Sequence, residues 1–154
     1  MDRNIENVNE SDLDTVAAFE LDGFREAFSK NELQRMLGLD YCIFKKLLHA
    51  GQIAAYTIFY LIAGEAELLK VYVAPEKRGM GLAYELITEC EREIAGRGGC
   101  VIHIEVRESN SSARALYLKA GYEEGGRRRE YYNNPSEDAI LMHKHLTDMR
   151  RGGN

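Results

Sequence analysis

Two periodicities of apolar and polar residues along the chain predict its helices and strands. Apolar residues recur every three or four positions, the spacing of one helix face, in segments 11–22, 29–37, 82–95 and 110–121. Apolar runs bounded by turn residues predict strands at 3–8, 41–48, 53–63, 64–73, 100–107, 122–132 and 138–146. The predicted order is β-α-α-β-β-β-α-β-α-β-β. Because helices separate some strands and hairpins separate others, we predict an α+β fold whose central sheet is mixed, mostly antiparallel and flanked by helices.

Polar residues mark the ends of three of these helices. Ser11 precedes an acidic first turn and is expected to open the first helix. Ser29 can cap the second helix, and Glu32 three residues later completes a capping box. Asn110 can cap the last helix, which Gly121 ends.

The stretch VAPEKRGMGLAYEL, residues 73–86, leads from a strand into a helix without a Ser, Thr, Asp or Asn cap. A helix N-terminus has unpaired amide donors and the positive end of its dipole. Gly79 and Gly81 let the backbone turn tightly, and Arg78 adds positive charge. A diphosphate could therefore take the place of the cap; an ordinary strand-to-helix turn is the alternative. The stretch matches neither a Walker loop nor the dinucleotide-binding glycine pattern.

The strand at 100–107 carries apolar residues on one face and polar residues on the other. The apolar face consists of Ile102, Ile104 and Val106. The opposite face consists of His103, Glu105 and Arg107. A strand flanked by helices in sequence is expected to be central and covered on both faces. Its polar face therefore either opens into a cleft or is neutralised by pairing within the trio.

Tyr117 is the polar candidate of the last predicted helix. It lies beside an apolar stripe formed by Ala113, Leu116 and Ala120. If the ring is buried, its hydroxyl needs a partner. Simple packing is the alternative explanation for a single tyrosine on a helix.

Composition limits the class of protein. The chain has 154 residues, a net charge of −5 and a sequence pI of about 5.4, which fits one domain over 1–154 and argues against bulk nucleic-acid binding. No apolar run approaches the roughly 18 residues of a membrane span, and the acidic start is unlike a secretion signal. The three cysteines match neither a zinc site nor a disulfide framework. We therefore expect a cytoplasmic protein without a metal, whose residues 147–154 form a flexible tail.

Three pieces of the sequence together resemble one family. RGMGLA, residues 78–83, fits the pattern R/Q-x-x-G-x-G/A and follows the preceding strand at the family's distance. EVRESNSSARALYLKAGY, residues 105–122, is similar to the longer and more specific pattern E-V-R-x-S-N-x-x-A-x-x-L-Y-x-x-x-G-F/Y. RRREYYNN followed by EDAILM is similar to the closing segment. From about Leu68 to Met142 the chain thus resembles the GNAT superfamily of acetyl-coenzyme A-dependent N-acetyltransferases, and within it the branch that acetylates protein N-termini, ribosomal ones with alanine above all.

The resemblance implies a GNAT fold in which acetyl-CoA lies across the end of the sheet. Backbone groups of Val71 and Val73 would pair with the pantetheine arm like an added strand. Amides from Gly79 to Tyr84 would hold the diphosphate, and Asn110 would contact the cofactor near the last helix. The implied cofactor-binding set is Val71, Val73, Arg78, Gly79, Met80, Gly81, Leu82, Ala83, Tyr84 and Asn110.

The same resemblance supplies candidates for proton transfer. Glu105 would be the base, directly or through a water. Because a free Glu titrates near 4.3, we expect a pKa raised by burial, or a water relay. Tyr117 would be the acid, although its reference pKa of about 10 lies above that of a thiol. A backbone amide near Val71 would stabilise the carbonyl oxygen as it becomes anionic.

Aromatic residues are the candidates for acceptor binding. Phe24 lies in the stretch DGFREAFSKNEL, which corresponds to the family's aromatic-rich segment, although Phe28 replaces a usual Trp. Tyr131 and Tyr132 would line a peptide groove; a hydrogen-bonded pair within a strand is the alternative. The run Arg127 to Arg129 would be a solvated basic face or a contact for a coenzyme phosphate.

Free-energy costs favour an α-amine as acceptor. Neutralising an α-amine of pKa about 7.8 at pH 7 costs roughly 1 kcal/mol, against roughly 4.6 kcal/mol for a lysine amine of pKa about 10.4. We therefore predict acetyl transfer to a protein N-terminus, with a ribosomal protein beginning with alanine as acceptor. The protein would be a monomer or weak homodimer without nucleic-acid or membrane partners. A small-molecule amine, a lysine side chain and a non-catalytic coenzyme A-binding subunit are the alternatives.

Overall fold

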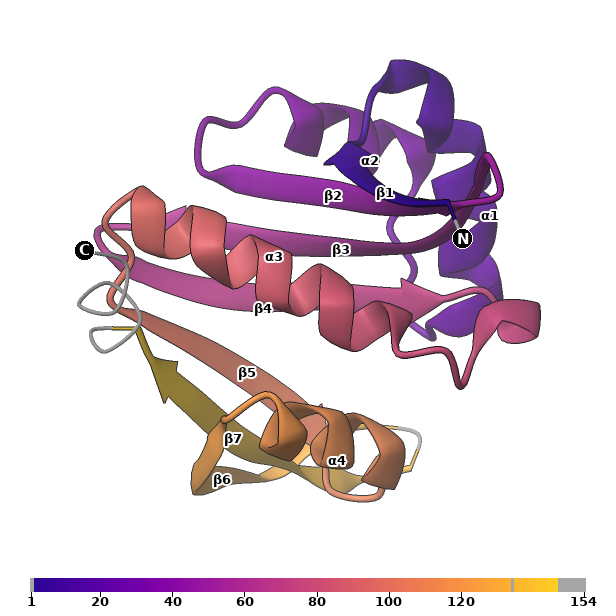
Figure 1. Ribbon diagram of the computed structural model, residues 1–154. Coiled ribbons are helices and arrows are strands. Elements are labelled where there is room, and N and C mark those ends of the chain that lie inside the picture. Colours follow the sequence, from indigo (N-terminus) through magenta and orange to yellow (C-terminus); the bar gives the residue numbers. More distant parts are fainter. Residues whose placement is uncertain (1, 134, 147–154) are drawn as a thin grey trace. The chain divides into compact units, whose positions relative to one another are not determined.

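The computed structural model describes residues 2–133 and 135–146 (Figure 1). The expected flexible tail at 147–154 lies outside the described residues. Helices and strands follow one another in the predicted order. Their bounds are β1 Arg3–Asn7, α1 Leu13–Gly23, α2 Lys30–Leu37, β2 Cys42–His49, β3 Gln52–Ile62, β4 Glu65–Val73, α3 Leu82–Gly96, β5 Val101–Arg107, α4 Ser111–Lys119, β6 Glu123–Tyr132 and β7 Glu137–His145.

The strands are hydrogen-bonded in the order β1-β2-β3-β4-β5-β7-β6. β4 and β5 run parallel, whereas β1–β2, β2–β3, β5–β7 and β6–β7 run antiparallel. The predicted mixed, mostly antiparallel sheet is therefore confirmed. The chain divides into two compact units. The first unit consists of Met1–Tyr60 and Leu69–Cys90, and the second unit consists of Leu61–Leu68 and Glu91–Asn154.

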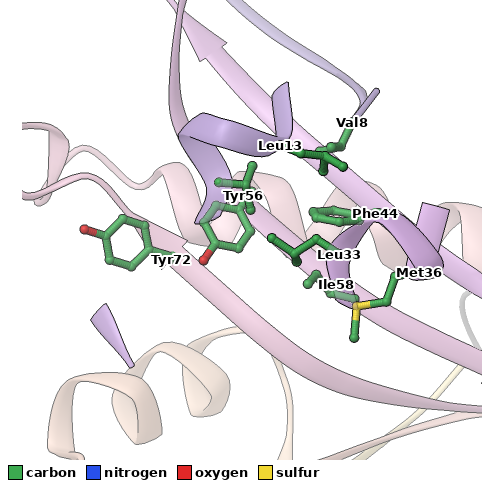
Figure 2. Packing of buried hydrophobic residues seen from close by; sticks show 9 residues of the cluster. Val8, Leu13, Leu33, Met36, Phe44, Tyr56, Ile58 and Tyr72 are labelled. Atoms are coloured by element: carbon green, nitrogen blue, oxygen red, sulfur yellow. The ribbon is translucent and has the colours of Figure 1, made fainter. Parts of the chain in front are cut away.

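In the first unit, apolar side chains of α1, α2 and strands β2 to β4 form one cluster (Figure 2). Its buried members are Val8, Leu13, Val16, Leu33, Met36, Phe44, Tyr56, Ile58 and Tyr72. The start of α3 packs against β2 and β3 in a second cluster, formed by Leu47, Ala54, Ala55, Leu82 and Leu86. Because β3 contributes to both clusters, every residue from 54 to 59 is buried, as expected for a strand covered on both faces.

Local capping in the first unit agrees with the sequence at α2 and differs from it at α1. The Ser29 hydroxyl accepts from the Glu32 amide at 3.1 Å, and the Glu32 carboxylate accepts from the Ser29 amide at 3.0 Å. The capping box is therefore confirmed. The expectation that Ser11 opens the first helix is wrong, because Asn9 caps a 3-10 turn at Glu10–Asp12 that leads into α1. Ser11 lies inside that turn, where its amide donates to the Asn9 side chain at 3.0 Å.

In the second unit, β5 is an interior strand between β4 and β7, as predicted. Its residues Ile102, Ile104 and Val106 are buried. The Asn110 side chain caps α4 by accepting from the Ala113 amide at 3.2 Å. β6 is an exposed edge strand whose pairing with β7 is irregular between Glu124 and Gly126 and between Arg128 and Tyr132. Within residues 2–133 and 135–146, no helix combines the length and apolar character that crossing a bilayer requires.

Candidate active site

The predicted anion-binding loop connects β4 to α3 in the first unit. Its glycines Gly79 and Gly81 have φ angles of +81° and +76°, in the left-handed region that favours glycine. A Cβ at either position would meet nothing within 4 Å, so backbone conformation, not crowding, requires glycine there. Gly81 immediately precedes the first residue of α3. Because glycine has no side chain, this helix has no side-chain cap at that position.

Main-chain donors are left available at this helix start. The first helical bond runs from the Glu85 amide to the Gly81 carbonyl at 3.1 Å. Within the part of the chain that the structure describes, the amides of Gly79 to Ala83 donate to no other residue. These donors lie at the positive end of the helix dipole, the arrangement in which proteins bind phosphate groups. The loop therefore fits a diphosphate.

Arg78 points back toward β4. Its Nε donates to the Val73 carbonyl at 3.0 Å, and its guanidinium lies 5.7 Å from the centre of the Tyr72 ring. Val71 and Val73 are half-buried on β4. A carbonyl oxygen has two lone pairs, so Val73 keeps one acceptor position for another donor.

Arg3 supports the same loop and was not found by sequence reasoning. Its guanidinium contacts the Glu85 carboxylate at 2.8 Å and the Met80 carbonyl at 3.2 Å. The contact joins residues 77 positions apart, so nothing local in the sequence indicates it. Leu82 is fully buried beside the loop, which fixes the start of α3.

Glu105 lies on β5 of the second unit, with partners from β6. Its side chain is 28% exposed, and its carboxylate accepts from the Arg128 Nε at 3.0 Å. A hydrogen bond to the same carboxylate raises the pKa of Tyr131. The side chain is therefore partly buried, and its role as the base, directly or through a water, stays a prediction.

Tyr117 is buried on α4, with 6% of its surface exposed. Burial raises the pKa of its hydroxyl well above the ordinary value, and nearby Tyr132 adds to the effect. The ring packs edge-on against Tyr122 at a centroid distance of 6.0 Å. Tyr117 therefore carries its proton at neutral pH, as a general acid must.

Tyr132 connects the two catalytic candidates. Burial, followed by the Glu105 charge and Tyr131, raises the pKa of Tyr132 to about 12. The Glu105 charge raises the pKa of Tyr132, and Tyr132 in turn raises the pKa of Tyr117. The rings of Tyr131 and Tyr132 meet edge to face at 5.1 Å, so these tyrosines contact each other through their rings.

The polar face of β5 pairs with other strands, and not within the trio. His103 contacts the Glu65 carboxylate and the His143 ring, both at 2.7 Å. Arg107 contacts the Glu137 carboxylate at 3.1 Å, and its guanidinium lies 4.3 Å from the centre of the Tyr132 ring.

The basic run on β6 is not simply a solvated face. Arg127 contacts the carboxylates of Asp138 at 2.7 Å and Glu108 at 2.9 Å. Arg128 is the partner of Glu105, a pairing that sequence reasoning missed.

Two predicted contact residues have structural roles of their own. The Asn110 side chain already accepts from the Ala113 amide as the α4 cap, so its contact with a cofactor stays a prediction. Phe24 lies in the first unit, half-buried, with the Lys70 ammonium 3.9 Å from its ring centre. Within the described ranges 2–133 and 135–146, no group of three or more His, Cys, Asp or Glu side chains could hold a metal ion.

Comparison with known proteins defines the class of this protein. Residues 9–122 match the model of the acetyltransferase (GNAT) family, a span of well over half the chain. The chain therefore belongs to the GNAT family, whose members are acetyltransferases that use acetyl-CoA.

Its relatives include enzymes with a named acceptor. The ribosomal protein bS18-alanine N-acetyltransferase of Escherichia coli (strain K12) is 34% identical over 119 residues, which cover 76% of either chain. The enzyme of the same name from Haemophilus ducreyi is 29% identical over 145 residues, covering 92% of this chain and 99% of that protein. The crystal structure of the ribosomal-protein-S18-alanine N-acetyltransferase from Escherichia coli matches with a TM-score of 0.85 at 28% identity, over 94% of both chains. The predicted fold is therefore confirmed.

Proposed function

We propose that this protein transfers an acetyl group from acetyl-CoA to the N-terminal α-amine of a protein, and that its acceptor is a ribosomal protein of the bS18 type with N-terminal alanine. The observation that supports the chemistry is a buried Tyr117 that keeps its proton, in the same compact unit as Glu105 and in a chain of this family. The acceptor rests on the names of relatives that cover three quarters or more of the chain. A ribosomal acceptor implies a reaction in the cytoplasm. The family match includes residues of both units, so we also propose one domain over 1–154.

The first unit would bind the cofactor mainly through its backbone. Amides from Gly79 to Tyr84 hold the diphosphate at the start of α3, and Val71 and Val73 offer backbone groups to the pantetheine arm. Asn110, the cap of α4, is a further candidate for contact with the cofactor. Acetyl-CoA, when bound, supplies the thioester whose acetyl group is transferred. A backbone amide near Val71 stabilises the carbonyl oxygen as charge develops on it.

The second unit would move the protons. A bond forms between the amine nitrogen and the acetyl carbon as the carbon–sulfur bond breaks. Glu105 accepts the proton that the amine loses, directly or through a water, and Tyr117 donates its proton to the departing thiolate. The proton on Glu105 then returns to Tyr117 through solvent. The raised pKa of Tyr117 makes its donation uphill, but apolar surroundings raise the proton affinity of the thiolate as well.

Acceptor binding would use aromatic side chains. Phe24 of the first unit and Tyr131 and Tyr132 of the second are the candidates. The contact of Tyr131 with Glu105 supports this assignment, since it puts an exposed ring beside the proposed base.

The test is a mass-spectrometric assay of acetyl transfer to peptides that differ only in their first residue, with N-terminally blocked lysine peptides and free polyamines as competitors. We expect acetyl on the α-nitrogen, with alanine as the best first residue. Transfer to polyamines or to the blocked lysine peptides, with none to free N-termini, would overturn the proposal. Tight coenzyme A binding without any turnover would instead indicate a non-catalytic subunit.

A further inference from the structure

Glu20 is a fully buried carboxylate to which the proposed reaction gives no role. It lies in the last turns of α1. Its hydrogen-bond partner Tyr56, like Tyr72, belongs to the apolar cluster of the first unit (Figure 2). Its carboxylate accepts from the Tyr56 hydroxyl and from the Phe28 amide, the latter at 2.9 Å, and lies 3.3 Å from the Lys70 ammonium. A buried charge is costly unless such partners satisfy it. The position therefore calls for an explanation beyond packing.

Lys70 of β4 completes an ion pair with Glu20 and contacts the connection between α1 and α2. Its side chain is only 12% exposed. The ammonium donates to the Glu26 carbonyl at 2.9 Å and lies 3.9 Å and 4.7 Å from the ring centres of Phe24 and Phe28. Cations at such distances from aromatic rings are attracted to their faces.

The pair of Glu20 and Lys70 thus makes four contacts with segment 24–28. The carboxylate bonds to the Phe28 amide, and the ammonium bonds to the Glu26 carbonyl and contacts two rings. All four contacts are made by the Glu20 carboxylate or the Lys70 ammonium. Because both groups are largely removed from bulk water, removing either charge should disturb these contacts.

A second tether fixes the start of the same segment. The Tyr72 hydroxyl donates to the Asp22 carboxylate at 2.8 Å. A Cβ on Gly23 would lie 2.4 Å from the Tyr72 ring, so only glycine allows this close approach. The segment is therefore anchored before and behind Phe24.

We propose that Glu20 and Lys70 are positioning residues, which hold segment 24–28 and so present Phe24 to the acceptor. This rests on the proposed function, since the acceptor role of Phe24 belongs to it. The pair touches neither the acceptor nor the cofactor in this scheme. Its loss should therefore change acceptor binding and leave acetyl-CoA binding unchanged.

The test compares Glu20→Gln, Lys70→Met and the double variant with the wild type. We expect the KM for the acceptor peptide to rise about tenfold or more, since a misplacement of about 1 Å can cost about a hundredfold. The KM for acetyl-CoA and the rate at saturating peptide should stay close to those of the wild type. Lys70→Arg keeps the cation beside both rings and should recover much of the loss.

A matched control is the ion pair of Asp12 and Lys46 in the same unit. Its charged atoms are 2.7 Å apart, and its side chains are 12% and 6% exposed. It lies at the opposite end of α1 and does not touch segment 24–28. The double variant Asp12→Asn with Lys46→Met should leave the acceptor KM unchanged.

Limited trypsin digestion gives a readout that needs no activity. Arg25 is exposed in the segment, and cleavage after it should be slow in the wild type and several times faster in the Glu20 and Lys70 variants at temperatures where each is folded. If Glu20→Gln does not fold, Lys70→Met and the double variant carry the comparison. Unchanged cleavage after Arg25 together with an unchanged acceptor KM would overturn the inference. If the variants are cleaved faster but the wild type does not acetylate peptides, the role of Glu20 and Lys70 in holding the segment is supported and the proposed function is contradicted.

Discussion

The loop after β4 and the surface around β5 and β6 provide their chemistry in different ways. The loop offers main-chain amides, and its side chains contribute little: Gly79 and Gly81 have none, and Arg78 is bonded to the Val73 carbonyl. The surface in the second unit offers side chains, and the protonation of Tyr117 and Tyr132 is set by burial and neighbours. A backbone site depends on conformation, so it should fail when φ is disturbed. A side-chain site depends on single groups, so it should fail when those groups are exchanged for isosteres.

The largest effect is expected when both proton-transfer groups are removed. Glu105→Gln with Tyr117→Phe keeps the size of both side chains and should lower kcat by about 10²- to 10⁴-fold, the usual contribution of acid–base catalysis. The affinity for acetyl-CoA should be unchanged, because the main-chain donors are untouched. Single-turnover measurements and calorimetry separate the two quantities. A double variant that retained most of its turnover would mean that other groups carry the protons.

A smaller effect is expected from a backbone change in the loop. Gly81→Ala places a Cβ at a φ of +76°, which costs roughly 1–2 kcal/mol for an L-residue. If binding requires this conformation, acetyl-CoA affinity should fall by about tenfold, since 1.4 kcal/mol corresponds to a factor of about 10.

Gly51 provides the matched control for this change. It has a φ of +78° in the turn between β2 and β3, and a Cβ there would also meet nothing within 4 Å. Gly51→Ala should lower the free energy of unfolding by a similar amount and leave the dissociation constant for acetyl-CoA unchanged. Equal losses of affinity in both variants would show that general destabilisation, not the loop, is responsible.

The dependence of rate on pH sharpens the side-chain part of the comparison. Because burial raises the pKa of Tyr117, its hydroxyl keeps its proton as the pH rises through 9. The value of kcat/KM should therefore increase as the acceptor α-amine loses its proton near about 7.8, and should then stay level up to pH 10. A decline between pH 8.5 and 9.5 that disappears in Tyr117→Phe would contradict this account.

The smallest effect concerns stability near Arg107. Hydrogen bonds from Ser109, and then Arg107, lower the pKa of Glu137 from its ordinary value of 4.5. Its contribution to the free energy of unfolding is therefore present above about pH 4.5 and is lost as the pH falls through the lowered value. Urea denaturation should separate Glu137→Gln from the wild type at pH 7, and the difference should shrink toward pH 3. A difference that did not depend on pH would exclude an ionic origin.

The order of elements could be read from the sequence because it depends on local patterns. The capping box of Ser29 and Glu32 is a signal contained in four residues. The same local reasoning predicted Ser11 as the start of the first helix, whereas Asn9 caps the turn that leads into α1. Both residues can cap a helix, and the local pattern does not show which of them does so. The place of β7 between β5 and β6 depends on pairing between distant segments, which periodicity does not encode.

The site was predictable in the same uneven way. Glycine positions and a missing cap indicated the loop, because they are local backbone requirements. The contact of Arg128 with Glu105 could not be found by alternation along β6. Glu130 has a φ of +48°, and the pairing with β7 is irregular from Arg128 to Tyr132. Arg128 and Tyr131 are three positions apart, so a regular strand would place their side chains on opposite faces. The irregularity lets both reach the Glu105 carboxylate.

The most direct test of the central claim is an NMR titration of the backbone amides with acetyl-CoA. The account predicts that the amide signals of Gly79 to Ala83 shift with increasing ligand, while that of Gly51 does not. Saturation of the protein with acetyl-CoA without any change at Gly79 to Ala83 would contradict it.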